Sequence, residues 1–356
     1  MRGPNEIDFW RGFALLTIFI NHIPGIFYER FTSRNFMLGD SAEMFVFLAG
    51  VSLRFVVGSN DRRVSAHDVT FRLFGRALQI YAAQILITMF ALAILAAAGH
   101  FLNQPALLDW HNAGPVFQDP VETHIGLVLL THQLGYFNIL PLYVVVMCMA
   151  PAFALLDRVS PYLALGVSFA IWMAVLVTGF NLPTWPVEGS WFFNPFGWQF
   201  VFVCGFVLAR GDGPGALVRR HRRWLRVLVT PFVVLGVVSA WNGYSPSPGD
   251  VPHPKLVFLF DKTYDSPARV FQFLCVALFL SGFWARLPGW FAPVSEYFSR
   301  LGRNSLEVFC VCSVLSLCGQ IAAYMYGGGI AKDTLVLSIG IVIMGLSAWL
   351  TEWRAR

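Results

Sequence analysis

The stretch RGFALLTIFINH, residues 11–22, decides the fold, because it has the composition of most of a membrane-spanning helix. It begins with Arg11 and ends with His22, a separation of about 16 Å along a helix that rises about 1.5 Å per residue. If the helix starts at the cytoplasmic face, His22 lies past the middle of the bilayer. A polar side chain at that depth is costly and usually has a function.

The rest of the chain has the composition of a polytopic membrane protein. Of its 356 residues, 56% are hydrophobic and only 13% are charged, and a membrane-spanning helix needs about 20 mostly apolar residues. The sequence therefore predicts an all-α polytopic membrane protein, with one bundle of about ten transmembrane helices that forms a single domain over residues 1–356. The expected segments are 9–28, 41–58, 77–98, 136–156, 162–180, 195–210, 227–241, 268–285, 305–326 and 334–351.

A proline and a glycine follow the deep histidine directly. Pro24 has no N–H to donate, and its ring crowds the carbonyl of Ile20. The helix is therefore expected to bend or open after His22. A break beside a polar residue at this depth favours a cavity there.

The basic residues predict the orientation. With the N-terminus in the cytoplasm, 19 of the 25 lysines and arginines fall at the inner face, including the RRHRRWLR cluster at residues 219–226. This asymmetry satisfies the positive-inside rule and places both termini in the cytoplasm. The net charge of +5 then reflects the basic residues at the inner face. We therefore expect a lipid bilayer around the protein and no nucleic-acid partner.

The cysteines and tryptophans predict no further site. All six cysteines lie inside apolar segments without a paired Cys or His spacing, so neither a disulfide framework nor a metal site is expected. On the expected outer side, the tryptophans favour an aromatic belt at the membrane surface over sugar stacking. They are Trp110, Trp185, Trp191 and Trp198.

A carboxylate is expected at the depth of His22. The second segment runs in the opposite direction, and Glu43 lies as far outward from Arg54 as His22 lies from Arg11. A neutral imidazole beside a carboxylate has the parts of a general base and its orienting partner. Asp40, one turn further out, is an alternative partner, and a buried His–Glu pair could also join two helices without any chemistry.

Four arginines mark the inner face. Arg11 and Arg54 lie below the expected His–Glu pair, while Arg72 and Arg76 are four residues apart and share one side of a helix. That spacing suits a polyphosphate ligand. Anchoring at the membrane surface is the alternative for all four.

Several longer strings resemble one family of transmembrane acyltransferases. They are DFWRGFALLTIFINHIPG (8–25), TSRNFMLGDSAEMFVFLAG (32–50), FNILPLY (137–143), FNPFGWQF (193–200) and LGRNSLEVFC (301–310). Together they are similar to the OpgC family, membrane proteins that succinylate osmoregulated periplasmic glucans in Gram-negative bacteria. The chain departs from the pattern at Asn21, where many members have an acidic residue, and at Asn304, where a histidine is frequent.

The resemblance implies a multi-pass enzyme of the bacterial inner membrane. Acyl-CoA, here succinyl-CoA, would enter from the cytoplasm as donor substrate, periplasmic glucan would be the acceptor, and no cofactor would stay bound. His22 would be catalytic, with Glu43 or Asp40 as its partner. The CoA phosphates would bind the four arginines at positions 11, 54, 72 and 76. The candidates for binding a succinyl carboxylate are Arg30, Arg34, Lys262 and Arg269.

The sequence is compatible with two mechanisms and with a competing function. His22 could deprotonate a glucose hydroxyl that attacks the thioester directly, or an acyl-histidine could form first. A transporter or flippase for a lipid-linked sugar also fits ten helices with deep charges. Consumption of acyl-CoA by the purified protein separates an acyltransferase from a carrier, and the sequence specifies no oligomeric state.

Overall fold

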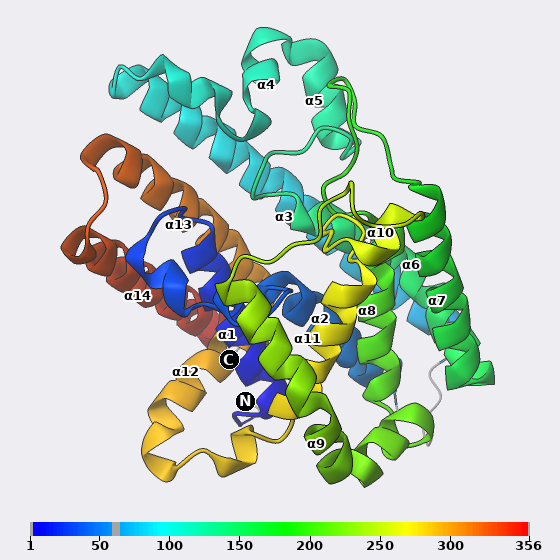
Figure 1. Ribbon diagram of the computed structural model, residues 1–356. Coiled ribbons are helices and arrows are strands. Elements are labelled where there is room, and N and C mark those ends of the chain that lie inside the picture. The colour runs from blue at the N-terminus through cyan, green and yellow to red at the C-terminus, as the bar shows by residue number, and fades with distance from the viewer. Residues whose placement is uncertain (1–2, 59–64, 355–356) are drawn as a thin grey trace.

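The computed structural model describes residues 3–58 and 65–354, which form an all-helical bundle (Figure 1). Every segment expected to span the membrane contains a helix. These helices are α1 (Glu6–Asn21), α2 (Ser41–Val57), α3 (Ala66–Phe101), α6 (Ile139–Val159), α7 (Pro161–Thr178), α8 (Pro195–Leu208), α9 (Gly213–Trp241), α11 (Pro267–Leu280), α13 (Ser305–Tyr326) and α14 (Ile330–Arg354). The predicted helical membrane class is thus confirmed.

Seven helices of the described chain are long and apolar enough to cross a membrane. They are α3, α6, α7, α9, α13, α14, and α11 together with the turn that follows it. Helices α1, α2 and α8 have 16, 17 and 14 residues and are shorter. The number of about ten spans and the cytoplasmic location of both termini stay predictions.

Helix α1 ends where the sequence predicts a break. Its last residue is Asn21, and His22 caps it by donating its backbone N–H to the carbonyl of Ile18 at 3.0 Å. The expected continuation of the helix to residue 28 is wrong, because Pro24 cannot donate to the helix. The chain instead turns into the short 3-10 helix η1 (Phe27–Phe31). The histidine therefore lies at a helix end.

Two helix pairs approach closely at glycines. On α1, a side chain at Gly12 would collide with the carbonyl of Phe298, and a side chain at Gly302 would collide with the carbonyl of Asp8. Small residues of this kind let helix backbones approach in membranes. Helices α2 and α8 meet in the same way through Gly50 and Gly205. These contacts fix α1 and α2, the two helices that carry the predicted catalytic residues.

Helix α12 (Ala292–Arg303), which packs along α1, has no counterpart among the expected segments. Its charged residues interrupt the apolar pattern, so hydropathy alone does not detect it. Arg303 at its end pairs with Glu352 of α14 at 2.8 Å. Because α12 contacts the start of α1 and the end of α14, both ends of the described chain lie at the same end of the bundle (Figure 1).

Short helices fill the connections between the long ones. In chain order they are η2 (Ser33–Asn35), η3 (Pro105–Asn112), α4 (Gly114–Gln118), α5 (Pro120–Val128), α10 (Lys255–Phe258), η4 (Trp284–Arg286) and η5 (Gly289–Phe291). The connection between η2 and α2 and the one between α10 and α11 both contribute to the cavity beside His22.

Candidate active site

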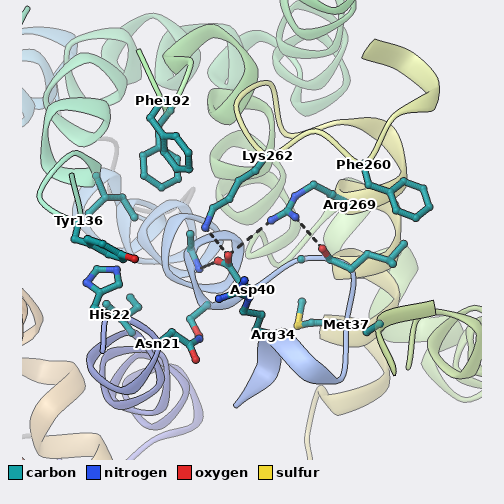
Figure 2. Close-up of a pocket in the computed structure, with 18 of the residues that line it drawn as sticks. Asn21, His22, Arg34, Met37, Asp40, Tyr136, Phe192, Phe260, Lys262 and Arg269 are labelled. Atoms are coloured by element: carbon teal, nitrogen blue, oxygen red, sulfur yellow. Dashed lines mark hydrogen bonds and ion pairs between the residues drawn. The ribbon is translucent and has the colours of Figure 1, made fainter. Parts of the chain in front are cut away.

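His22 lines a cavity of about 840 Å³. Asp40 at the start of α2, Lys262 before α11 and Arg269 on α11 line the same cavity. Figure 2 shows Tyr136 beside His22, and Lys262 and Arg269 converging on Asp40. The predicted cavity beside the broken helix is thus present, and it gathers both signs of charge next to an imidazole.

The imidazole of His22 is held by its neighbours and keeps one nitrogen without a partner. Its ring meets the ring of Tyr136 edge to face, with 4.9 Å between centroids. Its backbone carbonyl accepts a hydrogen bond from the side-chain amide of Gln320 on α13. Its Nδ1 atom is buried and has no hydrogen-bond partner within the described residues. Because His22 lines the cavity, its neutral imidazole could accept a proton from a hydroxyl bound there.

The sequence DSAE, residues 40–43, positions the carboxylates by a local motif. Asp40 caps α2, because its Oδ1 accepts the N–H of Ala42 at 2.8 Å, and Glu43 Oε2 accepts the N–H of Asp40 at 2.7 Å. This is a capping box, which satisfies backbone donors that a helix start leaves free. It directs the Glu43 side chain back towards the start of its own helix.

Two cations from the α10–α11 region neutralise these carboxylates. Lys262 donates to Asp40, and Arg269 donates to Glu43 and, at 2.8 Å, to the carbonyl of Leu38. Burial favours the neutral acid at Asp40, but the charges of Lys262 and Arg269 outweigh it and hold the pKa of this carboxyl below its usual range. Asp40 is therefore an ionised carboxylate in the same cavity as His22.

The structure separates the two carboxylates that the sequence offered as partners of His22. Asp40 lines the cavity, whereas Glu43 is fully buried behind it and bonds Arg269. Equal depth along two helices did not bring Glu43 and the imidazole into contact in the described chain, because the capping box turns the glutamate side chain away. The catalytic roles of His22, Asp40 and Glu43 stay predictions.

Three of the four predicted arginines share a second cavity. Arg11 of α1 and Arg72 and Arg76 of α3 line a space of about 550 Å³. Arg72 and Arg76 are exposed, and Arg76 donates to the amide of Gln79 at 3.1 Å. Guanidinium groups at the mouth of a cavity suit a phosphate-bearing ligand. Their predicted part in donor binding stays a prediction.

Arg54 lies apart from this cavity. Its guanidinium pairs with Asp157 of α6 and lies over the ring of Phe206, 4.2 Å from the centroid. Asp157 also pairs with Arg210 at 2.7 Å. These contacts join α2, α6 and the end of α8, so the geometry favours a structural ion pair. The predicted role of Arg54 in binding CoA stays a prediction.

One buried aromatic ring lies between the two cavities. Phe309 of α13 is fully buried and lines both of them. Its ring stacks on Phe45 with 5.9 Å between centroids, and Phe45 contacts Tyr143 at 5.5 Å. The arginines and His22 therefore lie on opposite sides of Phe309.

Sequence reasoning missed several residues of the site. Tyr136 and Gln320 hold the histidine, yet neither belongs to a charge pattern that would mark it. The only signal for Tyr136 is its position directly before the string FNILPLY. Lys262 and Arg269 were two of four unranked cations, and only the folded chain brings them to Asp40.

The fold and the site together define a class of protein: a polytopic helical membrane protein with a histidine and a carboxylate in one cavity and arginines in another. The family model described as OpgC protein matches residues 4–356. The chain therefore belongs to the OpgC family, as the sequence motifs predicted. Searches of curated proteins and of solved structures gave no match. Family membership and the helical membrane architecture together indicate a membrane acyltransferase.

Proposed function

We propose that this protein transfers a succinyl group from succinyl-CoA in the cytoplasm to hydroxyl groups of a periplasmic glucan, within the bacterial inner membrane. The observation that carries the proposal is the position of Phe309, which lies between a cavity lined by three arginines and a cavity lined by His22. A donor with its phosphates at the arginines would have to extend its thioester past this ring to reach the histidine.

The chain's own groups supply the proton transfer that acyl transfer needs. His22 takes the proton of the glucan hydroxyl as the hydroxyl oxygen attacks the thioester carbonyl carbon. The carbon–sulfur bond then breaks, and the imidazolium returns the proton to the departing CoA thiolate. The ionised Asp40 stabilises the imidazolium across the cavity. A route through an acyl-histidine uses the same residues and stays an alternative.

Replacement of His22 tests this function. His22→Ala should lower acyl transfer by about 10²- to 10⁴-fold, the usual contribution of a general base. The readouts are acyl substitution of periplasmic glucan by mass spectrometry and consumption of succinyl-CoA by the purified protein. His100→Ala, at the exposed end of α3, is the matched control. Unchanged substitution by His22→Ala at normal protein level would refute the proposal.

The cations of the His22 cavity support a donor with a free carboxylate. Of the four candidates from the sequence, Arg34, Lys262 and Arg269 line this cavity, whereas Arg30 does not belong to its lining. Lys262→Gln should therefore reduce the preference for succinyl-CoA over acetyl-CoA, with Arg30→Gln as the control. An unchanged ratio of kcat/KM for the two donors would remove Lys262 from acyl recognition.

A further inference from the structure

A third cavity lies on the other side of Tyr136 from the cavity that contains His22, which we call the charged cavity. Its volume is about 620 Å³, within the usual range for ligand pockets. Trp110 and His111 of η3, and Gln320 and Tyr324 of α13, line it together with Tyr136. The rings of Trp110 and Tyr324 meet edge to face, with 5.2 Å between centroids. We refer to it as the aromatic cavity.

The aromatic cavity is connected to His22 by direct contacts. Tyr136 and Pro24 line both this cavity and the one that contains the imidazole. His111 Nε2 lies 2.6 Å from Gln320 Oε1, and the amide nitrogen of the same glutamine donates to the carbonyl of His22. A ligand in the aromatic cavity would therefore contact the residues that hold the proposed general base.

The backbone beside this cavity is strained and firmly held. His111, Asn112 and Tyr136 have φ angles of 56°, 65° and 66°, in the left-handed region that residues other than glycine rarely adopt. The N–H of Gly135 donates to the His111 carbonyl at 2.9 Å, and the ring of His132 bonds the Asn112 carbonyl at 2.9 Å. Strain of this kind persists where surrounding structure enforces it and is concentrated at ligand sites.

The lining chemistry indicates the kind of ligand. Among the described residues that line the aromatic cavity there is no lysine or arginine, in contrast with both other cavities. Its one carboxylate, Asp333, already accepts the N–H of Phe27 at 2.9 Å. Aromatic rings beside amide and imidazole groups suit an uncharged ligand with apolar faces and hydroxyls at its edge. A phosphate or a carboxylate would find no cation there.

We propose that the aromatic cavity binds a sugar ring of the acceptor glucan, next to the sugar whose hydroxyl reacts at His22. This inference rests on the proposed function, and it assigns the uncharged acceptor and the charged donor to different cavities. It also changes the interpretation of Trp110, which the sequence favoured as part of an aromatic belt.

Direct binding of the acceptor tests the inference without any acyl transfer. The probe is periplasmic glucan from which the acyl groups have been removed, titrated calorimetrically into the purified full-length protein in detergent. Trp110→Ala and Tyr324→Ala should each weaken binding by about tenfold, the size of one lost aromatic contact. Trp110→Phe keeps a ring and should retain most of the affinity. Trp185→Ala, a half-exposed tryptophan outside the lining of this cavity, should bind as the unchanged protein does.

The outcomes separate this inference from the proposed function. If the unchanged protein binds glucan, Trp110→Ala and Tyr324→Ala bind it weakly, and no acyl group is transferred, the proposed function fails and the binding site stands. If it transfers acyl groups while Trp110→Ala and Tyr324→Ala bind glucan normally, the aromatic cavity is not the acceptor site. Loss of glucan binding in Lys262→Gln but in neither aromatic variant would place the acceptor in the charged cavity and overturn the inference.

Discussion

The cations on the two sides of Phe309 differ in how they are neutralised. Beside His22, Lys262 and Arg269 each bond a carboxylate, and their side chains are 31% and 9% exposed. In the other cavity, Arg72 and Arg76 are exposed, and neither forms an ion pair within the described chain. The first group is bonded to carboxylates of the chain, with Lys262 still partly exposed in its cavity, whereas the second group has no carboxylate partner there.

The difference follows from the free energy of burial. A buried charge is strongly destabilising unless a partner of opposite charge lies beside it. An exposed arginine keeps its hydration and gives up little of it to a phosphate. The network near His22 therefore holds the site in place, while the exposed arginines can bind a ligand without rearranging the fold.

Removal of a buried partner should have the largest effect. Glu43→Ala removes the nearer carboxylate of the buried Arg269 and leaves it only Asp40, at 3.9 Å, so it should lower the free energy of unfolding by about 3–5 kcal/mol. Glu43→Gln keeps the shape of the side chain and can still accept the N–H of Asp40, so its loss should be smaller. Thermal unfolding in detergent measures both. Equal stability of Glu43→Ala and the unchanged protein would mean that this ion pair does not stabilise the fold.

A third carboxyl in this network should make stability depend on pH. Asp265, in the loop before α11, is fully buried, and neither of its oxygens has a hydrogen-bond partner within the described residues. Burial and then the nearby charge of Glu43 raise the pKa of Asp265 well above its ordinary value of 3.8. The folded protein therefore keeps this proton at a pH where the unfolded chain has lost it.

The sign of the pH effect follows from this raised pKa. Stability should fall as the pH rises above about 4, by about 1.4 kcal/mol per pH unit for one proton, until the folded carboxyl ionises. Asp265→Asn removes this titration, and asparagine tolerates the left-handed backbone at this position, where φ is 50°. The variant should lose less stability than the unchanged protein between pH 5 and pH 8. Parallel melting curves would show that Asp265 is ionised in the folded state.

Loss of the exposed arginines should affect binding and leave stability alone. Arg72→Gln with Arg76→Gln should weaken succinyl-CoA binding by about tenfold or more, because each charged hydrogen bond contributes about 1.5–3 kcal/mol. The unfolding temperature should stay the same. Arg223→Gln, an exposed arginine on α9 outside this cavity, is the control. If the double variant bound succinyl-CoA with unchanged affinity, both arginines would act only as anchors at the membrane surface.

The smallest effect is expected at a surface ion pair. Arg34 and Glu29 are 2.8 Å apart, but the arginine side chain is 61% exposed. Arg34→Gln should therefore change the free energy of unfolding by less than about 1 kcal/mol. If Arg34→Gln lowered the free energy of unfolding as much as Glu43→Ala, the exposure of a cation would not determine how much its ion pair stabilises this protein.

The sequence predicted local features well where one segment carries the whole signal. Pro24 was sufficient to predict a break after His22, although not that α1 ends there, and a helix lies at every expected apolar segment. The depth argument for His22 and Glu43 failed to give a contact, because depth along two helices says nothing about the direction of a side chain. Helix α12 was missed because its charges hide it from hydropathy, although it packs closely on α1.

The sequence by itself determined the helical membrane class, the break after His22, and the family, because apolar length, proline geometry and motif strings are local properties. Only the tertiary structure decided that Asp40 shares a cavity with His22, that Lys262 and Arg269 neutralise the carboxylates, and that Phe309 divides the two cavities. The two ion pairs join residues more than two hundred positions apart. Helix packing and capping, which no single segment encodes, bring them together.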